Sequence, residues 1–143
     1  MIQRLADYVA DFMVAHDITN CFTVVGGGAM HLNDAFGHHP QIKSTYHHHE
    51  QGAAIAAESY ARQLEKPALL CVTTGPGGTN ALTGVVGAWL DSIPMMVISG
   101  QVSKNNASKS GRPIYPAFVK TLEKIKTFFW ASGARRNTRL PTA

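Results

Sequence analysis

The sequence predicts an α/β fold, in which a mostly parallel sheet lies between two layers of helices. The first observation is an order of elements, αβαβαβαβ, with short links between them. Strands that are apolar throughout and alternate with helices are typical of parallel sheets covered on both faces. The second is that two glycine-rich segments and a glutamate each follow a predicted strand. Sites in such sheets lie beyond the carboxyl ends of the strands, so these residues predict a site there.

The first half of the chain supplies two helices and two strands. Residues 3–16 predict an amphipathic helix, because apolar side chains recur there at helical spacing: Leu5, Val9, Phe12 and Met13. Residues 21–25 are an apolar run that predicts a buried strand entering a tight loop at Gly26, Gly27 and Gly28. A short helix is expected over 29–36, and a strand over 41–47, where polar and less polar residues alternate.

The second half repeats the pattern. Residues 50–62 are rich in alanine and predict a helix packed closely on the sheet. A buried strand is expected over 68–73, followed by a second glycine loop, from Gly75 to Asn80. A helix over 79–91 and a strand over 95–99 complete the series. Past Gly100 the pattern weakens, and only a helix over 116–127 and the start of a strand near 128–130 are indicated.

Charge divides the chain at about the same place. Residues 1–103 hold four Lys/Arg and eight Asp/Glu, a balance of −4, whereas residues 104–143 hold nine Lys/Arg and one acid, a balance of +8. A basic tail can bind nucleic acid or an anionic membrane, but this one matches no nucleic-acid motif, and we favour a solvated end. We therefore expect one domain over 1–103, incomplete at its C-terminal side, and a divergent basic segment over 104–143 that is partly helical or disordered.

Other classes of protein are disfavoured by composition. No apolar run reaches the ~18 residues that a membrane span needs, and the N-terminus lacks the apolar centre of a signal peptide, so we expect a cytoplasmic protein without a membrane span. Cys21 and Cys71 are expected to be buried free thiols. The run His47, His48, His49 alternates between faces of a strand and lacks partners at ligand spacing, so we expect no metal site and a role in local hydrogen bonding.

Three segments are candidates for a binding site. Gly26, Gly27 and Gly28 let the backbone approach a ligand closely, although a simple tight turn explains them equally well. The loop of Gly75, Pro76, Gly77 and Asn80 leads into a helix N-terminus, which favours polar or anionic ligands, and contact with a neighbouring subunit is the alternative. Glu50 begins a helix, where a carboxylate either stabilises the helix dipole or acts as an acid.

These segments, in this order, resemble a known family. The series runs through Val24 to Met30, His49 to Ala54 with Ala57 to Arg62, Thr73 to Asn80, Asp91 to Pro94, and Ser99 to Gln101. It is similar to the N-terminal, pyrimidine-binding domain of thiamin diphosphate enzymes of the acetolactate synthase, benzoylformate decarboxylase and pyruvate decarboxylase group. The resemblance covers residues 1–103 and implies the thiamin-diphosphate-binding fold.

The resemblance also implies roles for single residues. At the position of Glu50 the family has a catalytic glutamate that hydrogen-bonds N1′ of the cofactor's aminopyrimidine ring and so promotes formation of the reactive thiazolium ylide. By position, Gly26, Gly27 and Gly28 line the cofactor or substrate pocket, and Gly75, Pro76, Gly77 and Asn80 form a cofactor-side loop at a dimer interface. The implied substrate is a 2-oxo acid such as pyruvate, which is decarboxylated and joined to a second 2-oxo acid.

Two departures from the family lead to three hypotheses. The sequence contains no Gly-Asp-Gly motif, with which a separate domain of the family binds Mg²⁺ and the diphosphate, and the similarity fades after Gln101. The chain is therefore expected to be a half-site that is inactive alone, in a homodimer or beside a separate diphosphate-binding subunit. The alternatives are the small subunit of a split 2-oxo acid decarboxylase and a non-catalytic binding or regulatory module on the same fold.

Overall fold

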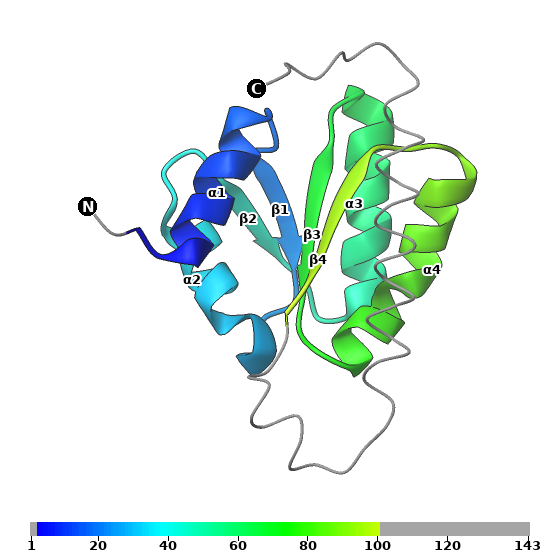
Figure 1. The fold of residues 1–143 in the computed structure, drawn as a ribbon. Helices are drawn as coiled ribbons and strands as arrows, with labels where there is room; N and C mark the ends of the chain where they lie inside the picture. The colour runs from blue at the N-terminus through cyan, green and yellow to red at the C-terminus, as the bar shows by residue number, and fades with distance from the viewer. Residues whose placement is uncertain (1–2, 101–143) are drawn as a thin grey trace.

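A computed structural model describes residues 3–100, in which helices and strands alternate along the chain (Figure 1). The elements are α1 (Leu5–Ala15), β1 (Asn20–Thr23), a single 3₁₀ turn η1 (Gly27–Ala29), α2 (Met30–His38), β2 (Lys43–Tyr46), α3 (Glu50–Leu64), β3 (Ala68–Val72), α4 (Pro76–Leu90) and β4 (Met95–Ser99). The expected helix over 116–127, the strand near 128–130 and the basic segment over 104–143 lie outside the described residues.

The four strands form one parallel sheet in the order β2-β1-β3-β4. Helices α1 and α2 lie together on one face, and α3 and α4 lie together on the other (Figure 1). The predicted three-layer α/β/α architecture is therefore confirmed, with every described strand parallel rather than most of them. Because all strands run the same way, their carboxyl ends share one edge of the sheet, which we call the carboxyl edge.

Each face of the sheet has its own core. Under α3 and α4, small helix side chains meet apolar strand residues; the buried members include Ala53, Ala54, Ala57, Leu70, Val72 and Val85. Under α1 and α2, the core is built from larger helix residues, among them Met13 and Phe36 with Leu69 and Cys71 from the sheet. Strand β3 is buried along its whole length, because both cores use it. The alanine-rich α3 therefore packs closely on the sheet, as its composition predicts.

Helix α4 starts earlier than the sequence predicts. The expected loop from Gly75 to Asn80 is wrong in extent, because the helix begins at Pro76 and leaves Gly75 alone outside it. Gly75 has a φ of 65°, a left-handed conformation that suits glycine, and its carbonyl oxygen accepts from the amides of Gly78 at 3.0 Å and Thr79 at 3.2 Å. Pro76 at the first position has a φ already suited to a helix. The low helix propensity of glycine therefore predicts the wrong starting residue for this helix.

Both cysteines are free thiols buried in the core under α1 and α2. Burial raises the pKa of Cys71 from 9.0 to about 12, and burial with the nearby Cys71 raises the pKa of Cys21 well above its usual range. Since both folded-state pKa values lie above the unfolded value, the stability that the neutral thiols contribute is present below about pH 9 and is lost as the pH rises.

We expect neither thiol to react with iodoacetamide in the folded chain at pH 8, because the thiolate is the nucleophile and both sulfur atoms are shielded. In urea, both thiols become modified within the same incubation. Intact-mass measurement of the two samples tests this expectation. Equal modification with and without urea contradicts the buried placement of Cys21 and Cys71.

Candidate functional site

The carboxyl edge brings together all three candidate segments. Gly26 to Gly28 follow β1, Glu50 follows β2, and Gly75 to Asn80 follow β3. Gly100 follows β4 and donates its backbone amide to Val72 at 2.8 Å. Segments separated by about fifty residues in the sequence thus meet because four parallel strands end at one place.

Glu50 and Asn80 make the central contact of this edge. Glu50 is the first residue of α3, and its Oε2 accepts a hydrogen bond of 3.0 Å from the side-chain amide of Asn80 in the first turns of α4. Both side chains are half-buried. The carboxylate therefore lies near the N-termini of two helices, whose free N–H groups and dipoles stabilise negative charge.

Gly77 keeps space open beside this carboxylate. It is buried in the first turn of α4, and a Cβ placed on it would lie 3.5 Å from Glu50 Oε1 and 2.9 Å from Thr73 Cγ2. A side chain at position 77 would therefore clash with Thr73, and it would come into ordinary contact with Oε1, the carboxylate oxygen that Asn80 does not hold. With glycine at this position, Oε1 lies close to the backbone of the first turn of α4.

Glu50 does not cap its own helix. The cap of α3 is His49, whose Nδ1 accepts from the backbone amide of Gln51 at 3.1 Å. His47 donates its backbone amide to the Thr23 carbonyl at 2.9 Å and so extends the β1–β2 pairing. Local hydrogen bonding was the role expected of these histidines. Within residues 3–100, no three His, Cys, Asp or Glu side chains are grouped so that they hold a metal ion.

The first glycine loop is held against the end of β3. The amide of Gly28 donates to Thr73 Oγ1 at 3.1 Å, and a Cβ on Gly26 would lie 2.5 Å from the Thr73 Cβ. Gly26 and Gly28 are therefore required by packing, which is the tight-turn explanation. Gly27 differs, because it is exposed and a Cβ there would meet nothing within 4 Å. Of the three, Gly27 is the one whose backbone is open to a ligand.

A small polar cluster that the sequence does not predict adjoins the ends of β1 and β3. Thr23 donates from Oγ1 to the Cys71 carbonyl at 2.7 Å and lies 3.3 Å from Asn33 Oδ1. Two buried nitrogens, Asn33 Nδ2 and His47 Nε2, have no hydrogen-bond partner within the described part of the chain. Buried polar atoms usually have partners, so the carboxyl edge holds hydrogen-bonding capacity that residues 3–100 do not use.

The Glu50–Asn80 contact gives a direct test. Asn80→Asp places a second carboxylate beside Glu50, and we expect a loss of about 1 kcal/mol of stability at pH 7 through charge repulsion in this half-buried setting. The loss shrinks in high salt, which screens the repulsion between the two carboxylates. Asn80→Ala, which removes the donor without adding charge, is the control. Urea denaturation at low and high salt checks this; the same salt response in both variants contradicts the contact.

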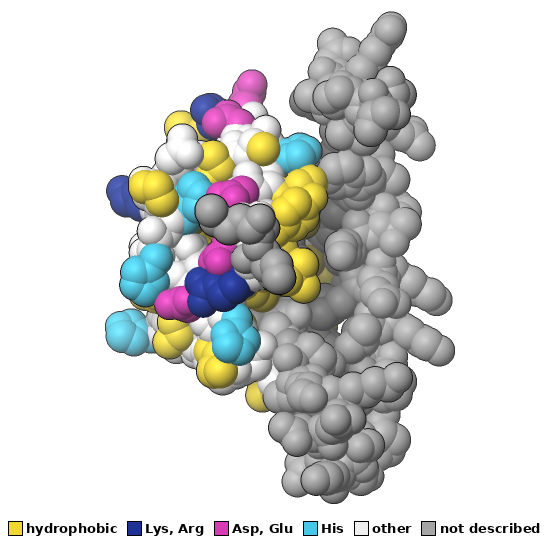
Figure 2. All heavy atoms as spheres, turned by 60° about the vertical axis from the view of Figure 1, so that its left-hand side comes forward, with side chains coloured by type: hydrophobic (Ala, Val, Ile, Leu, Met, Phe, Trp, Pro, Cys, Tyr) yellow, Lys and Arg dark blue, Asp and Glu magenta, His cyan; other side chains and the backbone are white. Residues whose placement is uncertain are grey.

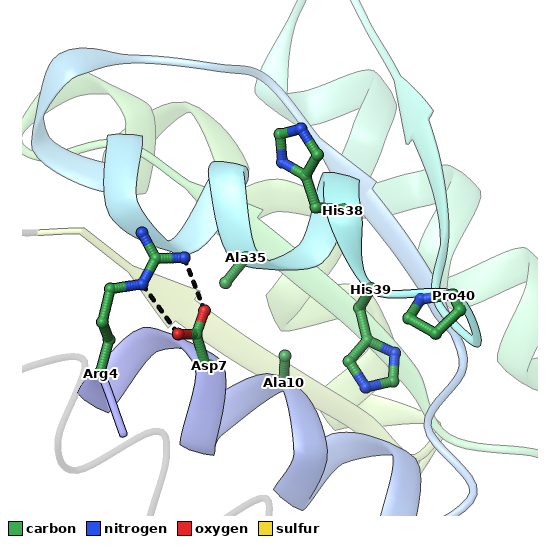
Figure 3. Close-up of a pocket in the computed structure, with 7 residues that line it drawn as sticks. All are labelled: Arg4, Asp7, Ala10, Ala35, His38, His39 and Pro40. Carbon is green, nitrogen blue, oxygen red and sulfur yellow. Dashed lines mark hydrogen bonds and ion pairs between the residues drawn. The ribbon is translucent and has the colours of Figure 1, made fainter. Parts of the chain in front are cut away.

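A separate cavity lies between α1 and α2 (Figure 3). It has a volume of about 210 Å³ and is lined by Arg4, Asp7, Ala10, Ala35, His38, His39 and Pro40. None of these residues belongs to the carboxyl-edge segments. The guanidinium of Arg4 already pairs with Asp7 at 2.7 Å and Asp34 at 3.0 Å, so its charge is compensated. The carboxyl edge, with its carboxylate and open backbone, is the better candidate for chemistry.

The geometry defines a class of protein, namely an α/β domain that presents a carboxylate and glycine-rich backbone at the carboxyl edge of a parallel sheet. The comparison with known sequences then identifies the family. Residues 3–135 match the family model described as "Thiamine pyrophosphate enzyme, N-terminal TPP binding domain". The chain belongs to this family. Its cofactor class is accordingly thiamin diphosphate.

Acetolactate synthases are among the curated relatives of the chain. The chain is 36% identical over 99 residues to the chloroplast acetolactate synthase of Arabidopsis thaliana, covering 69% of this chain and 15% of the relative. It is 39% identical over 100 residues to the acetolactate synthase large subunit of Buchnera aphidicola subsp. Acyrthosiphon pisum, covering 70% of this chain and 18% of the relative. The chain thus spans less than a fifth of the length of these relatives.

A solved structure shares the fold. It is the X-ray structure of a Mycobacterium smegmatis protein described as a thiamin diphosphate-dependent enzyme, with a TM-score of 0.72 and 20% identity. The match covers 93% of this chain and 28% of that one. In the described part of the chain, no helix has both the length and the apolar character that crossing a membrane requires.

Proposed function

We propose that the carboxyl edge is the pyrimidine-binding half of a thiamin diphosphate site in an acetolactate synthase-like enzyme. The observation that carries the proposal is the Glu50 carboxylate, which Asn80 fixes at 3.0 Å near two helix N-termini and beside the bare backbone of Gly77. A half-buried carboxylate anchored through one oxygen keeps the other for a ligand. That arrangement suits a flat heterocycle with a ring nitrogen at its edge.

The residues present fit this ring. Gly77 puts no side chain of its own against Oε1, and Gly27 and Gly75, where a Cβ would meet nothing within 4 Å, add open backbone at the same edge. Bound thiamin diphosphate supplies the electron sink for decarboxylating a 2-oxo acid. The chain's own contribution is then to orient the ring and, through Glu50 Oε1, to share a proton with the ring nitrogen. Asn80 holds the carboxylate in the orientation that this sharing requires.

We propose further that the chain alone lacks synthase activity. Its sequence contains no Gly-Asp-Gly motif for Mg²⁺ and the diphosphate, and it aligns with only 15–18% of its acetolactate synthase relatives. The diphosphate end of the cofactor would then be bound by a partner domain or by a separate subunit. The second arrangement is the split-enzyme alternative. The 2-oxo acid proposed for the assembled enzyme is pyruvate.

A symmetric contact through α4 is part of this proposal. The outer side of α4 exposes Val86, Trp89 and Leu90, and the last of these is 71% exposed. Large exposed apolar side chains on one helix are typical of an interface between subunits. Because the N-terminus of the same helix carries Gly77 and Asn80, a contact along α4 would place a second copy of the chain close to the carboxyl edge.

A chimera tests the proposed function. In it, the segment of the Buchnera large subunit that aligns with this chain is replaced by the corresponding residues from 3–100. We expect acetolactate formation from pyruvate by the chimera and none by the chain alone. A folded chimera that binds no thiamin diphosphate contradicts the half-site, and synthesis by the pure chain contradicts the need for a partner domain.

A further inference from the structure

Thr73 lies where three segments of the carboxyl edge meet. It directly follows β3 and is half-buried, and its Oγ1 accepts a hydrogen bond of 3.1 Å from the backbone amide of Gly28. Its carbonyl oxygen accepts from Ser99 Oγ, at the end of β4, at 3.1 Å. The α1–α2 side differs, because charged, histidine and hydrophobic side chains are interspersed there (Figure 2) and the charge of Arg4 is already compensated. Thr73 thus joins the segments that follow β1, β3 and β4.

The methyl group of Thr73 lies beside two glycines from different segments. A Cβ on Gly26 would lie 2.8 Å from Thr73 Cγ2, and a Cβ on Gly77 would lie 2.9 Å from the same atom. Both distances are too short for a real contact, so the two glycines leave free the space that this methyl group occupies. Gly77 precedes Asn80 by three residues in α4, and Asn80 holds Glu50. Thr73 is therefore adjacent both to the first glycine loop and to the turn that orients the carboxylate.

The first glycine loop is tied to the sheet by the Thr73 hydroxyl. Its internal hydrogen bond, from the amide of Ala29 to the Gly26 carbonyl at 3.0 Å, closes the turn but joins the loop to itself. The bond from Gly28 to Thr73 joins the loop to the end of β3. Gly27, which precedes this bond, is exposed, and a Cβ there would meet nothing within 4 Å. The hydroxyl therefore helps to determine where this open backbone lies relative to the carboxylate.

We propose that Thr73 is a positioning residue of the thiamin diphosphate site, whose hydroxyl holds the first glycine loop in place for the cofactor. The inference rests on the proposed function, because it gives the open backbone of Gly27 a part in binding the aminopyrimidine ring. Glycine loses more conformational freedom on ordering than any other residue. A loop that a hydrogen bond has already ordered avoids that loss when the cofactor binds. Removing the bond should therefore weaken cofactor binding while leaving Glu50 in place.

Amide hydrogen exchange in the full chain tests the hydrogen bond without any cofactor. Thr73→Val removes the hydroxyl with little change in shape, whereas Thr73→Ser keeps the hydroxyl and removes the methyl group. We expect the Gly28 amide to exchange at least ~tenfold faster in Thr73→Val. It should keep its rate in Thr73→Ser and in the control Thr83→Val, which changes an exposed threonine on α4. Equal Gly28 exchange in Thr73→Val and Thr73→Ser, or acceleration spread over the amides of β1 and β3, overturns the proposal.

The chimera supplies a readout that a purely structural role would not change. We expect Thr73→Val to raise the thiamin diphosphate concentration for half-maximal activity about tenfold, with kcat changed less than about twofold. The value of kcat is kept because Glu50 retains its contact with Asn80. Thr73→Ser and Thr83→Val should retain the cofactor affinity of the parent chimera. A fall in kcat without a change in affinity, or equal affinities in Thr73→Val and Thr73→Ser, overturns the proposal.

Failure of the half-site and failure of the Thr73 role give different results in this experiment. If the parent chimera binds no thiamin diphosphate, the half-site is wrong and the role of Thr73 falls with it. If the parent binds the cofactor and Thr73→Val binds it as tightly, the half-site stands and the role of Thr73 is overturned. Weaker binding by Thr73→Val, with parental binding by Thr73→Ser, supports both.

Discussion

In the chimera, Glu50→Gln lowers the rate of acetolactate formation by about 10²- to 10⁴-fold, the range typical of a lost acid–base group. Glutamine has nearly the shape of glutamate and can accept from Asn80 through its amide oxygen, so the local structure is preserved. What it cannot do is share a proton with a ring nitrogen. We therefore expect the loss in kcat, with little change in the midpoint of thermal unfolding.

Glu65→Gln is the matched control. It removes a carboxylate from the residue that ends α3, far along the helix from Glu50. We expect it to retain the activity of the parent chimera. If Glu50→Gln and Glu65→Gln are equally active, Glu50 has no catalytic role. If Glu50→Gln instead unfolds the chimera, the carboxylate is structural and the assignment is equally wrong.

Gly84→Ala destabilises the full chain by about 2 kcal/mol, because it overfills the contact between α3 and α4. A Cβ on Gly84 would lie 2.6 Å from the Ala54 Cβ and 2.8 Å from the Ala54 carbonyl carbon and the Ile55 amide nitrogen. Two of these three atoms belong to the backbone, so no side-chain rotation relieves the clash. The helices must separate, and their N-termini carry Glu50 and Asn80.

Gly87→Ala, one turn further along α4, should instead raise the free energy of unfolding. A Cβ there would meet nothing within 4 Å, so the change brings only the higher helix propensity of alanine, worth up to about 1 kcal/mol. Urea denaturation of both variants measures the two free energies of unfolding. Destabilisation by both, or by neither, contradicts the close approach of α3 and α4 at Gly84.

Much of the described fold follows from pattern alone. The apolar runs that become β1, β3 and β4 and the alanine-rich α3 were predicted close to their observed positions, because a parallel sheet covered on both faces leaves few other uses for such runs. The start of α4 was missed because its first residues include two glycines, which propensity assigns to a loop. Tertiary packing favours them there, since Gly77 and Gly78 are both buried.

The site was predicted in outline rather than in detail. Glu50 and Asn80 were both candidates, yet only the structure shows that they contact each other, since nothing local links residues thirty positions apart. Thr73, which holds the first glycine loop, and Gly100, whose Cβ would lie 2.3 Å from the Gly28 carbonyl oxygen, fall within the family motifs but were given no role in the site. Their positions directly after β3 and β4 were the available signal. The compartment and the metal-binding partner domain remain predictions.

Calorimetric titration with thiamin diphosphate and Mg²⁺ tests the central claim most directly. The chain is titrated alone and then mixed with any Gly-Asp-Gly-containing protein that is encoded beside it, with Glu50→Gln run in parallel. We expect binding in the mixture, little or none by the chain alone, and a clear loss of affinity in Glu50→Gln. Binding by the mixture that Glu50→Gln leaves unchanged, or no binding in either sample, would contradict a thiamin diphosphate half-site centred on Glu50.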